Sequence, residues 1–146
     1  MNLKAEKFKA YIAENNITNF KVEESINNNE EENARVTFHT YVKVFGQKLP
    51  AVIVMDESIY VILRVQVIPD IEYMKNKDEF IHCVNEMNIN YKAVKYYLGA
   101  DNALYLDMYI PNKNDDLDGE LVMDLLNAIT VHLKKEYPNW MKLLWN

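Results

Sequence analysis

The chain has 146 residues, 49% of them hydrophobic and 26% charged, which indicates one globular domain spanning residues 1–146. Its formal net charge is −6 and its lysines are scattered, which argues against a nucleic-acid binder, since such proteins carry a basic stripe. A single cysteine excludes an internal disulfide, the amino terminus lacks the apolar stretch of a secretory signal, and no apolar run approaches the ~20 residues of a membrane helix. We therefore expect a cytoplasmic protein that binds no membrane.

The chain opens with an amphipathic pattern. Residues 2–16 place apolar side chains at helical spacing, and residues 19–25 alternate apolar and charged side chains as a half-buried strand does. The segment 26–33 is polar, carries adjacent like charges and has no apolar anchor, which is typical of a solvated loop.

The clearest element is ARVTFHTYVKVF, residues 34–45. Its apolar positions alternate with polar ones, the period-2 pattern of a strand with one core face. The apolar set is Ala34, Val36, Phe38, Val42 and Val44. Short turns then separate this run from LPAVIVM and from IYVILRVQV, so the sequence predicts an antiparallel meander.

The second half of the chain is predicted to contain a helix, a β-hairpin and a long helix. Their residue ranges are 76–90, then 93–98 with 103–110, and finally about 119–137. We expect Pro138 to interrupt the last helix. The predicted order is α-β-β-β-β-α-β-β-α, an α+β fold whose three helices cover one face of an antiparallel sheet.

The stretch IHCVNEMNIN, residues 81–90, contains the residue types of a cysteine-protease site. On a helix His82 and Cys83 point roughly 100° apart, and the apolar positions place Cys83 on the inner arc and His82 in solvent. Cys83 is then a small buried hydrophobe whose thiolate is disfavoured. We predict no catalytic residue here and a non-enzymatic protein.

The same stretch contains an Asn-x-x-Asn pair. Asn88 falls at a helical angle that should face the core, where an amide without a partner costs ~1–3 kcal/mol. We therefore predict that Asn88, flanked by Asn85, is a structural clasp that holds the helix end or a nearby strand through backbone hydrogen bonds.

Residues 114–119 resemble the start of a calcium-binding loop. Such a loop needs a bidentate glutamate at its twelfth position, where this chain has Leu125. Asp118 is better placed as the N-cap of the following helix, with Glu120 in its first turn. The three histidines show no ligand spacing, and three glycines cannot form a phosphate-binding motif, so we expect no metal and no cofactor.

The carboxy-terminal half resembles the YbjN-like family, which has the fold of type III secretion chaperones. The similarity covers residues 80–137, through a helix ending VNEMN, the hairpin YKAVKYYLGADNALYLDMYIP and the start DLDGEL of a long helix. Asn85 and Asn88 fall on the asparagine pair of the family. The resemblance implies a small, acidic, usually dimeric protein that binds other proteins or acts as a regulator.

Aromatic residues are predicted on the face of the sheet opposite the core. Tyrosine offers a large apolar area with a polar tip and is enriched at interfaces. The residues predicted for a partner or dimer face are Tyr41, Tyr60, Ile62, Tyr97, Tyr105 and Tyr109. The alternative is that these tyrosines are scattered singly or covered by the tail 138–146, which carries both tryptophans.

Three functions remain open at this point. The first is a homodimeric protein-binding or regulatory module of chaperone-like fold, whose protein partner is unknown. The second is an immunity or inhibitor protein that uses its acidic loops to neutralise a basic toxin or nuclease. The third is an enzyme without recognisable motifs.

Overall fold

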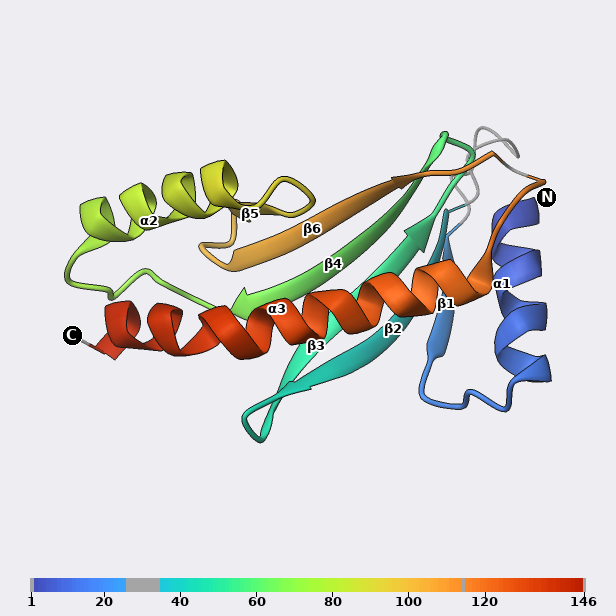
Figure 1. Ribbon diagram of the computed structural model, residues 1–146, viewed down its shortest axis with the longest axis horizontal. Helices are drawn as coiled ribbons and strands as arrows, with labels where there is room; N and C mark the ends of the chain where they lie inside the picture. Colours follow the sequence, from blue (N-terminus) through green and yellow to red (C-terminus); the bar gives the residue numbers. More distant parts are fainter. Residues whose placement is uncertain (1, 26–34, 114, 146) are drawn as a thin grey trace.

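Six antiparallel strands form one sheet, and three helices are gathered on one of its faces (Figure 1). The computed structural model describes residues 2–25, 35–113 and 115–145. Its elements are α1 (Leu3–Glu14), β1 (Lys21–Ser25), β2 (Arg35–Val44), β3 (Gln47–Met55), β4 (Tyr60–Ile68), α2 (Lys77–Asn90), β5 (Lys95–Leu98), β6 (Leu104–Pro111) and α3 (Gly119–Trp145). The predicted α+β class and element order are confirmed. The predicted loop at 26–33 lies outside the described residues.

The strands lie in the order β1-β2-β3-β4-β6-β5. The β2–β3 hairpin turns through Phe45 and Gly46, which both have positive φ, and Val44 pairs with Gln47 across this two-residue turn. After β4 the chain passes through α2, runs along the edge as β5 and turns back as β6, which pairs with both β4 and β5. The first four strands therefore form the predicted meander, and the hairpin extends it.

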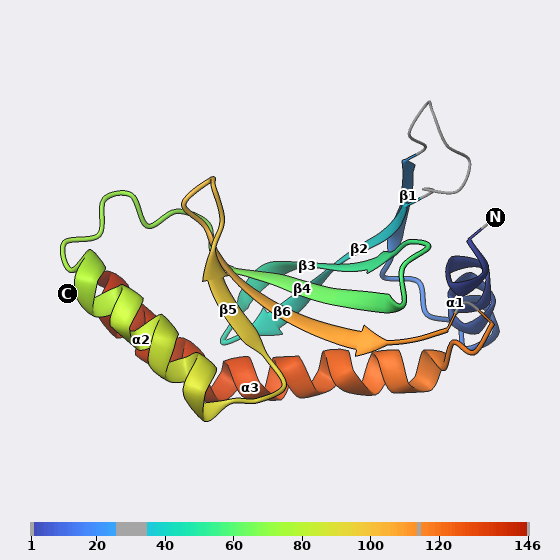
Figure 2. The same cartoon turned by 90° about the horizontal axis from the view of Figure 1, so that it is seen from above.

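The core lies between the sheet and the helical layer. The predicted alternation in β2 holds, because Val36, Phe38, Val42 and Val44 are buried. Figure 2 shows α3 running lengthwise beneath the sheet, with α1 at one end and α2 at the other. Aromatic rings fill both ends: Phe8 packs edge-on against Phe38, and Trp140 contacts Phe80 and Tyr96.

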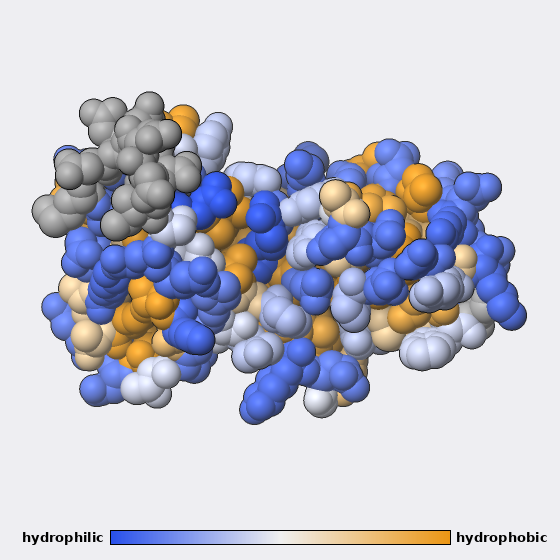
Figure 3. Space-filling model, turned by 180° about the vertical axis from the view of Figure 1, so that it is seen from behind, coloured by the Kyte–Doolittle hydropathy of each residue, from blue (hydrophilic) through white to orange (hydrophobic). Residues whose placement is uncertain are grey.

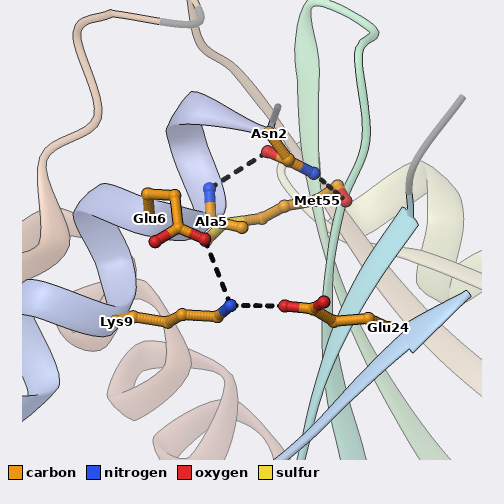
Figure 4. A network of polar contacts seen from close by, with 6 residues as sticks. All are labelled: Asn2, Ala5, Glu6, Lys9, Glu24 and Met55. Atoms are coloured by element: carbon orange, nitrogen blue, oxygen red, sulfur yellow. Dashed lines mark hydrogen bonds and ion pairs between the residues drawn. The ribbon is translucent and has the colours of Figure 1, made fainter. Parts of the chain in front are cut away.

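Polar contacts fix α1 to the sheet (Figure 4). Asn2 caps the helix, because its side chain accepts a hydrogen bond from the Ala5 N–H and donates one to the Met55 carbonyl at 2.8 Å. Lys9 forms ion pairs with Glu6 on the same helix and with Glu24 on β1. The helix is thereby joined to β3 and to the edge strand β1.

The predicted end of the last helix is wrong. Helix α3 continues through Pro138 to Trp145. Buried positions recur along the same stripe before and after the proline, at Ile129, Leu133 and Trp140. Burying the Trp140 ring against Phe80 and Tyr96 outweighs the backbone hydrogen bond that the proline cannot donate.

The prediction of a half-buried strand at 19–25 is correct in place and wrong in burial. All five residues of β1 are exposed, and Val22 retains 39% exposure. The strand lies at the sheet edge and rises away from α3, so neither of its faces is covered by the helical layer (Figure 2). Phe20, just before the strand, makes the core contact instead, against Phe8.

Candidate functional site

In the described part of the chain, the helices lie on one side of the sheet, and we call the opposite face the open face (Figure 2). Figure 3 views the molecule from the side of the open face. By register this face carries the odd-numbered residues of β1, β2, β5 and β6 and the even-numbered residues of β3 and β4. All six residues predicted for a partner face lie on it. Tyr41, Tyr60 and Tyr109 are exposed, and Ile62, Tyr97 and Tyr105 are half-buried.

A bidentate ion pair lies at the centre of the β4–β6 half of this face. Arg64 Nε and Nη2 each donate to a different oxygen of Asp107 at 2.9 Å. The carboxylate is fully buried, whereas the arginine side chain keeps 35% exposure. Hydrogen bonding to Asp107 raises the pKa of Arg64 further above its already high ordinary value.

Two tyrosines complete the shell around this carboxylate. The hydroxyl of Tyr97 donates to Asp107 Oδ1 at 3.2 Å, and that of Tyr109 donates to Oδ2 at 2.8 Å. Burial, and then the neighbouring carboxylate, raise the pKa of Tyr97 and of Tyr109. Asp107 thus accepts four hydrogen bonds, which uses its lone pairs and fixes the surrounding rings.

The remaining rings on this half are also in contact with one another. Tyr97 stacks on Tyr105 with centroids 5.6 Å apart, and Tyr60 meets Tyr109 edge-on at 6.3 Å. The Lys95 ammonium lies 5.1 Å from the centroid of Tyr97 and 5.8 Å from that of Tyr109. The tyrosines of β4, β5 and β6 are therefore one bonded cluster and are not scattered singly.

The other half of the open face is less crowded. Tyr41 is 60% exposed and lies at a shallow hollow of about 370 Å³, which we call the Tyr41 hollow. Its walls include Lys21, His39, Pro50 and Val52. No hydrogen bond or ring contact holds the Tyr41 side chain among the described residues, so its ring is available to a partner.

Asn88 is bonded to a strand, although not in the core. Its amide accepts a hydrogen bond from the Tyr96 N–H at 2.7 Å and donates one to the Tyr96 carbonyl at 3.0 Å. The residue is exposed, so the expectation that it faces the core is wrong: it caps the outer edge of β5 as a neighbouring strand would. Asn85 is exposed and forms no hydrogen bond among the described side chains.

The Cys-His pair of α2 lies as the helical geometry predicts. Cys83 is half-buried against the core, and burial raises the pKa of its thiol, as do Glu86 and Glu79 nearby. His82 is exposed and pairs with Glu86 at 3.1 Å on its own helix. A thiol held in its neutral form, with its histidine turned outward, is not an activated nucleophile.

The calcium-like stretch serves as a helix start. Asp118 accepts a hydrogen bond from the Leu121 N–H at 3.1 Å, the N-cap predicted for it, while Asn114 lies outside the described residues. Gly119 is required for packing, because a Cβ there would lie 2.4 Å from the Tyr11 ring. In the described ranges, no group of three or more histidine, cysteine or acidic side chains could hold a metal ion.

The Arg64–Asp107 pair is the part of the site that sequence reasoning missed. Each residue is a lone charge in an apolar strand, at a position facing away from the core. A single charged residue in such a strand was the signal from which the ion pair could have been suspected. Their contact depends on the β4–β6 register, which spans α2 and cannot be read from either strand alone.

Comparisons with known proteins supply no further assignment. No protein-family model matches the chain, and no curated protein matches its sequence. None of the helices in the described part of the chain combines the length and the apolar character needed to cross a bilayer.

Proposed function

We propose that the chain is a non-enzymatic, cytoplasmic protein-binding or regulatory module that contacts its partner through the open face of the sheet. The observation that carries the proposal is the clustering of tyrosines on this face, opposite the helical layer. Tyrosine clusters supply a large contact area at low conformational cost. Membership in the YbjN-like family, with its chaperone-like fold, is part of the same proposal and rests on the resemblance of residues 80–137.

The bonding of the cluster supports binding over catalysis. The lone pairs of Asp107 are engaged by Arg64, Tyr97 and Tyr109, so the carboxylate is not poised to take a proton from a substrate. Fixed rings also lose little side-chain freedom when a partner docks, which favours association.

Site-specific photocrosslinking tests the proposal. A photoreactive phenylalanine analogue at Tyr41 or Tyr60, in the full chain expressed in its native cells, is expected to form covalent adducts with another protein. Tyr73, which is 89% exposed and lies in the loop before α2, is the matched control position. Adducts equally abundant from Tyr73, or none from the two open-face positions, would refute binding through this face.

A further inference from the structure

The open face is positively charged although the whole chain is acidic. Counted over the residues of the six strands, six lysines and arginines and two carboxylates lie on it, a surplus of four positive charges. The basic residues are Lys21, Arg35, Lys43, Lys48, Arg64 and Lys95. The chain as a whole has a net charge of −6, so the strand residues of this face differ in sign from the whole chain. Lysines that are scattered along the sequence are thus gathered in space.

The free charges gather around the Tyr41 hollow. Lys21 pairs across the strands with His39, and Lys43 pairs directly with Lys48, which makes this the next pair after Tyr41–Pro50 on the same face, two residues along the strands. All three lysines are exposed and take part in no salt bridge within the described ranges. Among the residues of β1, β2 and β3 on this face, the carboxylate is that of Glu23, which lies 2.9 Å from His39 Nε2. Like charges left opposite each other without a counterion are unfavourable until an anion approaches.

Building on the proposed function, we propose that the partner presents an acidic polypeptide segment, whose carboxylates contact the lysines around the Tyr41 hollow while its apolar or aromatic residues pack on Tyr41, Pro50 and Val52. The hollow has the required character, because apolar side chains and Lys21 line it, and the Lys43–Lys48 pair is next to the Tyr41–Pro50 pair on the same face. Charge complementarity of this kind steers association and selects the partner.

Three other occupants fit this face less well. A second copy docked face to face would bring two surpluses of positive charge together, which argues against the expected homodimer in that geometry. Single-stranded nucleic acid needs open ring faces for base stacking. Here Tyr41 is the one tyrosine among the described residues of its half of the face, and on the other half Tyr97 and Tyr105 stack on each other with Lys95 over Tyr97, so successive bases would not find consecutive open rings. A basic toxin would likewise be repelled, so the inhibitor alternative gains no support from this face.

Fluorescence anisotropy with a labelled random copolymer of glutamate and tyrosine tests the inference. The full chain is expected to bind this probe at low ionic strength and to lose the binding as salt rises. Changing both Lys43→Glu and Lys48→Glu should weaken the affinity by about tenfold or more, because it reverses the charge beside the hollow. The two residues change together, so the pair remains like-charged and the fold is little affected.

Lys134→Glu with Lys142→Glu is the matched control. Both residues are exposed on α3, across the molecule from the open face, and the double change alters the net charge equally. Equal weakening by the two double variants would show a net-charge effect and overturn the inference. Tighter binding of an oligouridylate than of the copolymer, or a dimer in light scattering that the Lys43 and Lys48 changes alter, would also overturn it. Photocrosslinking from Tyr41 without copolymer binding would refute only the inference of an acidic partner. If neither crosslinks nor copolymer binding were observed, the proposed function would be refuted as well.

Discussion

Removing one member of the Arg64–Asp107 pair tests how the open face is held together. Arg64→Met leaves the fully buried carboxylate of Asp107 with only the hydroxyls of Tyr97 and Tyr109 as donors. Stranding a buried charge costs ~3–5 kcal/mol, and we reduce this to about 2–3 kcal/mol because the arginine side chain is one-third exposed and water can enter where it was.

The reverse change should cost less. Asp107→Asn leaves a guanidinium that already reaches solvent, and the new amide oxygen still accepts from part of the original donor set. The expected loss is about 1–2 kcal/mol. The predicted order of the two losses in stability follows from burial alone, because the Asp107 carboxylate is fully buried whereas the Arg64 side chain is 35% exposed.

Chemical denaturation followed by circular dichroism measures the free energy of unfolding of both variants, and thermal unfolding gives their Tm. For a chain of this length, 2–3 kcal/mol corresponds to a fall in Tm of roughly 5–10 °C. The Arg64→Met/Asp107→Asn double variant should lose less than the sum of the two single losses, because each single change already breaks the pair. Additive losses, or a smaller loss for Arg64→Met than for Asp107→Asn, would refute the view that the buried carboxylate is the costly member.

Three further changes test other contacts. Gly119→Ala should destabilise the fold by about 1–3 kcal/mol in urea denaturation, because its Cβ would meet the Tyr11 ring at 2.4 Å; an unchanged midpoint would mean that the ring moves aside freely. Asn88→Ala should cost about 1–2 kcal/mol through the two lost hydrogen bonds to β5, whereas Asn85→Ala should be close to neutral, and equal losses would contradict the edge cap. Burial lowers the pKa of His132, so the folded state binds this proton less readily than the unfolded chain. The contribution of the neutral imidazole to stability is therefore fully present above about pH 6.5 and is lost as the pH falls. The decline in Tm between about pH 7 and pH 5 should be smaller for His132→Phe.

The element order was readable from the sequence because each element has a local signature. The alternation in residues 35–44 predicts which side chains of β2 are buried, and the structure agrees position by position. The carboxy-terminal helix shows the limit of local rules. Pro138 is a strong stop signal in isolation, but the burial of Trp140 depends on Phe80 and Tyr96 from other elements, which no local rule includes.

The position of the tyrosines on the open face could be predicted for a similar reason, but the contacts between their side chains could not. Outward positions follow from strand period, so Tyr105 and Tyr109 could be placed opposite the core. Which side chains meet across strands depends on register. The contact of Arg64 with Asp107 and the approach of Lys43 to Lys48 both depend on it, so neither the ion pair nor the local positive charge could be derived from composition.

The two halves of the open face differ in how their polar groups are used, and this difference separates folding from recognition. On β4, β5 and β6 the hydroxyls of Tyr97 and Tyr109 and the guanidinium of Arg64 are bonded to one buried carboxylate. On β2 the side chains of Tyr41 and Lys43 are exposed and free of ion pairs within the described ranges. Changes to Arg64 or Asp107 should therefore lower stability and weaken binding by loosening the tyrosine cluster that they hold, whereas changes around Tyr41 should alter binding in a molecule that stays folded. A Tyr41→Ala variant as unstable as Arg64→Met would contradict this division, since both halves would then serve the fold.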